Sequence, residues 1–143
     1  MSPQFHANLL CAWIGILLGF LSGLGFGLFF HRENWLGGYG SFKRRMYRLA
    51  HISFFGLAVV NFMFFLTVQQ PLITNHPSGT TSAASLAFIV GAISMPLCCF
   101  LMAHFPKTHL LFAVPVLSLL FGGTLTIISL LHHSSIPLLQ SGL

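Results

Sequence analysis

Residues Leu9 to Phe30 read LLCAWIGILLGFLSGLGFGLFF and contain no charged side chain. About 20 consecutive apolar residues in helical form are enough to span the hydrocarbon core of a bilayer. The stretch therefore predicts a transmembrane helix. Three further stretches have the same character, at about 46–68, 83–103 and 110–131. The sequence thus predicts one integral-membrane domain over residues 1–143, an all-α protein with four transmembrane helices in a bundle.

The composition supports the membrane class and limits the chemistry. Hydrophobic residues make up 55% of the chain and charged residues only 5%, whereas soluble domains carry about a quarter charged residues. Glu33 is the one acidic residue, so the chain has neither a carboxylate pair nor a Ser-His-acid set. We therefore expect a protein that is not an enzyme. The basic excess indicates membrane topology, and we expect no nucleic-acid partner.

The basic residues predict the orientation of the chain. All six lie in or directly beside the loops 31–45 and 104–109, namely Arg32, Lys43, Arg44, Arg45, Arg48 and Lys107. Positively charged loops stay on the cytoplasmic side, so we predict that both termini lie outside. A bacterial inner membrane is the expected location, and an organellar inner membrane is the alternative.

Two features within the spans predict helix packing. Gly15, Gly19, Gly23 and Gly27 recur every four residues, which places them in one column on the first helix. Such a column is a groove in which a neighbouring backbone can approach closely. It would accept another helix of this chain, a partner subunit or a flat prosthetic group. Asn61, deep in the second span, needs a polar partner, and we expect an interhelical hydrogen bond.

A cluster of basic residues opens the second helix. Ser41 can cap this helix, and Lys43, Arg44, Arg45 and Arg48 follow in its first turns. Cations at a helix N-terminus oppose the helix dipole, so another interaction must favour them. Anionic lipid headgroups would supply about 1 kcal/mol for each basic residue near the surface. An acidic region of a partner subunit is the alternative.

The histidines are the main candidates for chemistry. His51 lies about one turn inside the second helix, and His104 ends the third at a comparable depth. If these helices are neighbours, the two imidazoles could ligate one haem b iron or contact a quinone headgroup. The alternative is a histidine that only forms a hydrogen bond at the interface. Metal binding by His31, Glu33 and His109 is chemically possible, but no helical metal-binding spacing supports it.

The first loop and its flanks carry a resemblance. Residues 29–40 read FFHRENWLGGYG and residues 48–51 read RLAH. This region resembles small four-helix bacterial membrane proteins, a likeness that covers the first two helices and brings no established activity. The four-helix layout, with histidines at the helix ends, is also similar to small proteins that accompany haem-copper oxidases.

These observations lead to one expected function and two alternatives. We expect an accessory membrane subunit of a respiratory or photosynthetic electron-transfer complex, which packs against partner subunits and contacts a haem, quinone or lipid. The first alternative is a free-standing electron carrier with haem b held by His51 and His104. The second is a small-solute carrier, although neither internal repeats nor paired broken helices are evident in the sequence.

Overall fold

The computed structural model describes residues 3–70 and 79–140, and within this part the four predicted transmembrane helices are confirmed. The long helices are α1 (Pro3–Phe30), α2 (Phe42–Val68), α4 (Gly79–His104) and α5 (Ala113–Gln140). Two short 3₁₀ helices, η1 (Trp35–Gly37) and η2 (Pro106–Phe112), lie in the connections. Each long helix is long and apolar enough to cross a bilayer.

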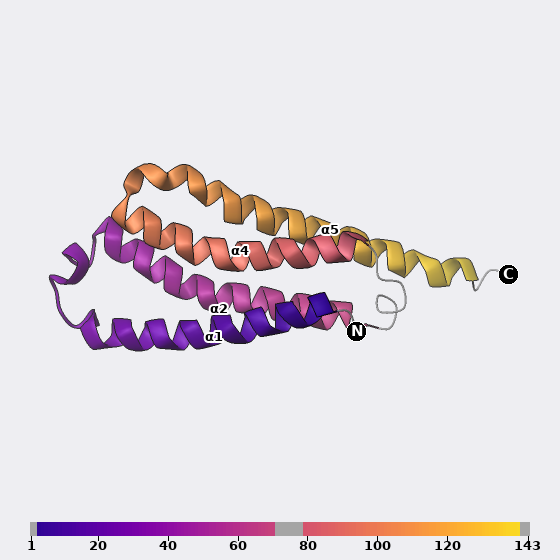
Figure 1. The fold of residues 1–143 in the computed structure, drawn as a ribbon, viewed down its shortest axis with the longest axis horizontal. Helices are drawn as coiled ribbons and strands as arrows, with labels where there is room; N and C mark the ends of the chain where they lie inside the picture. Colours follow the sequence, from indigo (N-terminus) through magenta and orange to yellow (C-terminus); the bar gives the residue numbers. More distant parts are fainter. Residues whose placement is uncertain (1–2, 71–78, 141–143) are drawn as a thin grey trace.

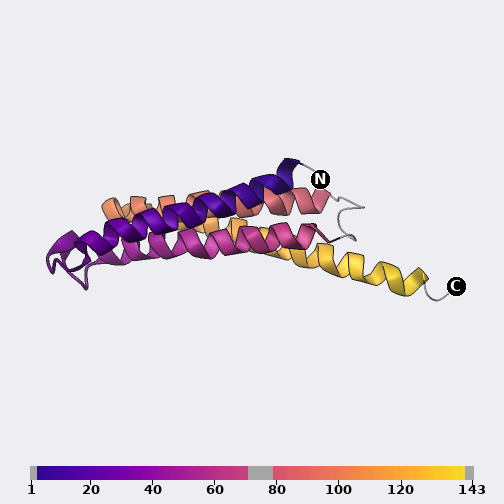
Figure 2. The ribbon, with the colours of Figure 1, turned by 90° about the horizontal axis from the view of Figure 1, so that it is seen from below.

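Helices that follow one another in the sequence also pack side by side (Figure 1). The central pair is α2 and α4, with α1 packed on α2 and α5 packed on α4. In an apolar 18-residue stretch of each central helix, 39% of the residues are buried. The corresponding share for each outer helix, α1 and α5, is 11%. Helices η1 and η2 lie at one end of the bundle, so the predicted cytoplasmic loops share an end, and the N-terminus of α1 lies toward the other (Figures 1 and 2).

The helices extend beyond the predicted spans. The first begins at Pro3 rather than at about residue 9, the second at Phe42, and the last continues to Gln140. Ser41 is the N-cap of α2, as predicted, because its hydroxyl oxygen accepts a hydrogen bond from the Arg44 backbone N–H at 3.1 Å. Before that cap the chain turns at Gly37 and Gly38, whose φ angles of 87° and 93° are accessible to glycine without strain.

The interface between α4 and its neighbours combines apolar packing with small polar contacts. Phe64 of α2 and Phe88 of α4 have ring centroids 5.1 Å apart and form the centre of the core cluster. The Ser118 hydroxyl on α5 donates to the Ala87 carbonyl oxygen of α4 at 2.6 Å. Because lipid competes for apolar surface, such close packing and hydrogen bonding hold transmembrane helices together.

Candidate functional site

The glycine column of α1 faces α2. A Cβ atom on Gly15 would lie 3.1 Å from both the Ala58 Cβ and the Phe54 carbonyl oxygen, so the two backbones approach closely there. A Cβ on Gly19 would lie 2.6 Å from the Phe55 ring, and one on Gly23 would lie 3.0 Å from the His51 ring. Three of the four predicted glycines therefore accept side chains of α2.

Gly27, the fourth glycine of the column, differs from the other three. A Cβ atom built there meets nothing within 4 Å among the described residues, because Gly27 lines an open cavity. At this position the column contacts no other helix of the described part of the chain, and the predicted packing of Gly27 against a neighbour stays a prediction. The column changes from a helix contact to a cavity wall between Gly23 and Gly27.

His51 is held on the side of α2 that faces α1. The Ser22 hydroxyl lies 3.0 Å from the Gly19 carbonyl oxygen and 2.9 Å from His51 Nδ1, and the imidazole tautomer sets the direction of the bond between Ser22 and His51. In either tautomer Nε2 can exchange a hydrogen bond with another group. The rings of Phe26 and Phe55 contact the imidazole edge-to-face, each with a centroid distance of 5.5 Å.

His104 is held elsewhere. Its Nε2 lies 3.0 Å from the Tyr47 hydroxyl, and Tyr47 also contacts Phe100 and Phe26 edge-to-face. His51 thus contacts α1, whereas the Tyr47–His104 pair joins α2 to the end of α4. The cavity that His51 lines does not include His104. The two histidines therefore have different hydrogen-bond partners, and of the two only His51 lines this cavity.

Arg44 lies inside an aromatic cage at the start of α2. Only 1% of the residue is exposed, and its guanidinium carbon lies 3.9 Å from the Tyr39 ring centroid and 4.6 Å from that of Phe30. The Trp35 ring follows at 5.6 Å. One nitrogen, Nη2, donates to the Phe30 carbonyl oxygen at 2.8 Å, whereas Nε and Nη1 have no hydrogen-bond partner in the described part of the chain.

Arg44 is thus the buried member of the basic cluster, which the prediction of lipid or partner contacts did not distinguish from its neighbours. The sequence shows Phe30, Trp35 and Tyr39 near this cluster but does not show that their rings enclose one arginine. Lys43 is half-buried, and Arg45 and Arg48 are exposed. These three side chains remain on the surface, where the predicted contacts are still possible.

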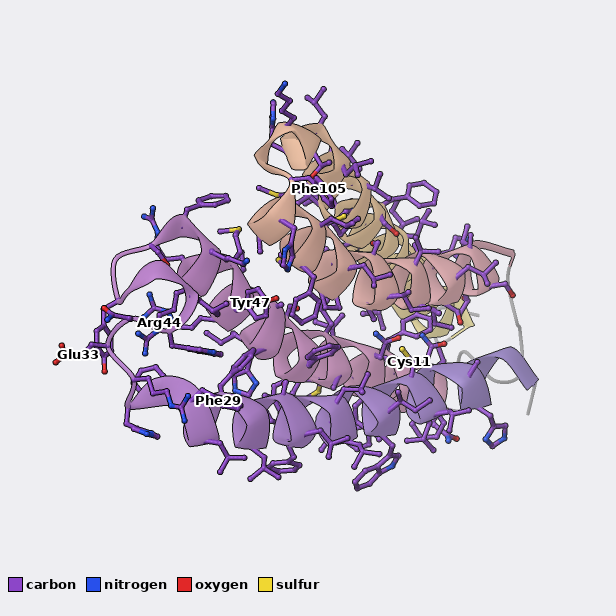
Figure 3. The ribbon with its side chains drawn as sticks, turned by 60° about the vertical axis from the view of Figure 1, so that its left-hand side comes forward. Cys11, Phe29, Glu33, Arg44, Tyr47 and Phe105 are labelled. Atoms are coloured by element: carbon purple, nitrogen blue, oxygen red, sulfur yellow. The ribbon has the colours of Figure 1, made fainter. Side chains whose placement is uncertain are left out.

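A cavity of about 320 Å³ lies between the last turns of α1, the η1 connection and the first turns of α2. This volume is in the range of small-molecule sites in proteins. Its walls are mainly apolar, with polar atoms from Arg44, Tyr47, Arg48 and His51. Glu33 is not among the lining residues, and Figure 3 shows it at the outer edge of the loop, away from Arg44.

A polar cluster near the opposite end joins three helices. Asn61 is fully buried, and its Oδ1 accepts from Asn8 Nδ2 of α1 at 2.9 Å. Asn61 Nδ2 donates to the Leu57 carbonyl oxygen at 2.9 Å, and the Ser85 hydroxyl of α4 donates to Asn8 Oδ1. The predicted interhelical hydrogen bond of Asn61 is confirmed, with a partner in Asn8 that lies just before the predicted first span.

A second cavity, of about 240 Å³, lies between α1, α2 and α4 near Cys11 (Figure 3). Its lining residues are apolar apart from the Cys11 thiol. The cavity could therefore hold a hydrocarbon chain, but it has few groups that could bind a polar ligand or act in catalysis. Within residues 3–70 and 79–140, no three His, Cys, Asp or Glu side chains come together as metal ligands. His31, Glu33 and His109 therefore do not form a three-ligand site there.

Comparison with known proteins gives no assignment. No protein-family model matches the chain, and neither a curated protein nor a solved structure shows significant similarity to it. The function must therefore be argued from the residues and geometry described above.

Proposed function

We propose that this chain is an accessory membrane subunit that acts by packing against other subunits of a respiratory or photosynthetic electron-transfer complex. The observation that carries the proposal is the difference between the central and outer helices. Only 11% of the residues in the apolar stretches of α1 and α5 are buried, against 39% in those of α2 and α4. Each outer helix therefore offers most of its surface to a neighbour in the membrane.

Small residues on the outer surfaces support this role. A Cβ atom on Gly25 of α1, Gly56 of α2 or Gly123 of α5 would meet nothing within 4 Å. Glycine at a helix surface allows another helix backbone to approach closely, which favours association in the bilayer. Since these three glycines serve no contact among the described residues, a helix of another subunit is the partner that would use them.

The kind of complex is inferred from the loop end of the bundle. His51 and His104 lie there among many aromatic rings, at the depth where a neighbouring subunit could hold a haem or quinone. Each histidine already has a hydrogen-bond partner of its own, His51 in Ser22 of α1 and His104 in Tyr47 of α2. These separate partners favour an accessory subunit over a haem b carrier.

The proposal includes a membrane and an orientation, and the orientation is inferred from the basic residues of the loops. All six basic residues lie toward the end that carries η1 and η2, so we place that end in the cytoplasm of a bacterium. Lys43, Arg45 and Arg48 would then contact anionic headgroups of the inner leaflet or an acidic region of a partner.

The proposal is tested by isolating the chain from its native membrane at its natural expression level. A tag on the chain, mild detergent and native electrophoresis should recover it in a larger complex that contains redox subunits. The Gly123→Leu variant should weaken this recovery while the isolated chain stays folded, because a Cβ atom at this position meets nothing within 4 Å among the described residues. Recovery of the tagged chain without any other membrane protein would refute the proposal.

A further inference from the structure

The cavity between α1, η1 and α2 has one unusual property, a buried cation without a counter-charge. Arg44 is 1% exposed, and its Nε and Nη1 atoms have no hydrogen-bond partner in the described part of the chain. Aromatic rings favour a guanidinium over their faces, but they accept no conventional hydrogen bond. A buried charge normally has an ion-pair or hydrogen-bond partner, so two buried nitrogen atoms without one call for an acceptor from outside the described part of the chain.

The charges around the cavity define the chemistry of that acceptor. Arg44 and Arg48 both line it, and no acidic residue does. Glu33, the only acid of the chain, is exposed at the edge of the loop and points away from Arg44 (Figure 3). A neutral ligand would leave the buried Arg44 guanidinium charge uncompensated, whereas a phosphate accepts well from arginine N–H groups.

The remaining walls define the rest of the ligand. Phe26, Phe30 and Ile52 are apolar, and Gly27 leaves space where a side chain would otherwise stand. His51 also lines the cavity, and its Nε2 can exchange a hydrogen bond with a hydroxyl of a polar headgroup, because a hydroxyl both donates and accepts. The cavity therefore combines two cations, one imidazole and an apolar wall, which fits a lipid and not a free ion.

We propose that this cavity binds the headgroup of an anionic phospholipid, with the phosphate at Arg44 and Arg48 and a headgroup hydroxyl at His51. The site lies at the end of the bundle where the basic loops gather, which is where inner-leaflet headgroups are expected. Phosphatidylglycerol carries both the phosphate and the hydroxyl groups that this arrangement requires. The lipid would supply the acceptors that Arg44 lacks and thereby fix the η1 connection against α1. The inference does not depend on the packing role proposed above.

The test uses the fluorescence of Trp35, which lines the cavity. The chain has two tryptophans, so a Trp13→Phe background leaves Trp35 as the only one. The full chain is placed in phosphatidylcholine vesicles with rising amounts of phosphatidylglycerol that carries brominated acyl chains, which quench nearby tryptophan. Half-maximal quenching should need about thirtyfold less brominated phosphatidylglycerol than brominated phosphatidylcholine, the ratio given by about 2 kcal/mol for the two basic contacts.

Two substitutions at open positions provide a matched comparison. Gly27→Leu places a side chain into the cavity, and Gly25→Leu places the same side chain on the same helix outside it. Neither new Cβ meets an atom within 4 Å, so both variants should fold. The preference for phosphatidylglycerol should disappear in Gly27→Leu and persist in Gly25→Leu. Arg44→Gln should also remove the preference, and Gly27→Leu decides the matter if Arg44→Gln does not fold.

Several results would overturn the proposal. Equal quenching by the two brominated lipids would show a cavity that does not select charge. Displacement of phosphatidylglycerol by the same mole fraction of decyl-ubiquinone would identify a neutral quinone as the better ligand. Loss of the preference in millimolar inorganic phosphate would show that a free anion takes the place of the lipid. An unchanged preference in Gly27→Leu would place the lipid outside the cavity.

Discussion

Substituting alanine for Gly19 tests the contact between α1 and α2. The new Cβ would lie 2.6 Å from the nearest atom of the Phe55 ring, whereas carbon atoms in contact prefer about 3.5–4.0 Å. The ring would therefore have to retreat by about 1 Å. It is confined by Phe20 and His51, whose ring centroids lie 5.4 Å and 5.5 Å away. Overpacking of this kind costs about 1–3 kcal/mol.

The matched control is Gly25→Ala on the same helix, where the new Cβ meets nothing within 4 Å. Both substitutions gain the same helix propensity, up to about 1 kcal/mol, so the difference between them isolates the clash. We expect Gly19→Ala to unfold more easily than Gly25→Ala by about 1–3 kcal/mol. The assay is unfolding by sodium dodecyl sulfate in mixed micelles, followed by circular dichroism. Equal free energies of unfolding for the two variants would refute the packing of Gly19 against Phe55.

Three further predictions concern other parts of the chain. Asn61→Leu should lower the free energy of unfolding by about 1–3 kcal/mol in the same assay, because it leaves buried polar partners unsatisfied; an unchanged value would show that the polar cluster does not stabilise the fold. His51→Ala and His104→Ala should have additive effects on stability to within about 0.5 kcal/mol, since the two rings have separate partners; a double variant no worse than either single one would indicate one shared site. In a cysteine-free background, Asn34→Cys should react with a membrane-impermeant thiol reagent only from the cytoplasmic side, and His132→Cys only from outside; the reverse pattern would invert the predicted topology.

The four spans were predictable because the bilayer imposes length and hydropathy on each of them. The helix ends were harder to predict, since hydropathy does not determine where a helix stops outside the hydrocarbon core. The first helix includes Asn8 in its buried part, because Asn61 and Ser85 satisfy the amide through two other helices. Such a partnership joins residues far apart in the sequence. No local pattern around Asn8 reveals it.

The candidate site was predictable in its residues and less so in its geometry. Spacing of four identified the glycine column, and Gly15, Gly19 and Gly23 do contact α2. The role of Gly27 depends on how the η1 connection folds back, which spacing alone does not determine. For the same reason, Arg44 was grouped with its exposed neighbours, although the loop encloses it. Charge patterns locate a basic cluster but do not show which member is buried.

The proposed function is tested most directly by an absorption spectrum taken before and after the chain is separated from its partners. The natively isolated complex is first examined in mild detergent, and the chain is then released in a stronger one and examined alone. We expect any haem Soret band to remain with the partner subunits and the isolated chain to show only aromatic absorption. A Soret band that stays with the isolated chain, and is lost in His51→Ala, would contradict the role as an accessory subunit and favour the haem b carrier.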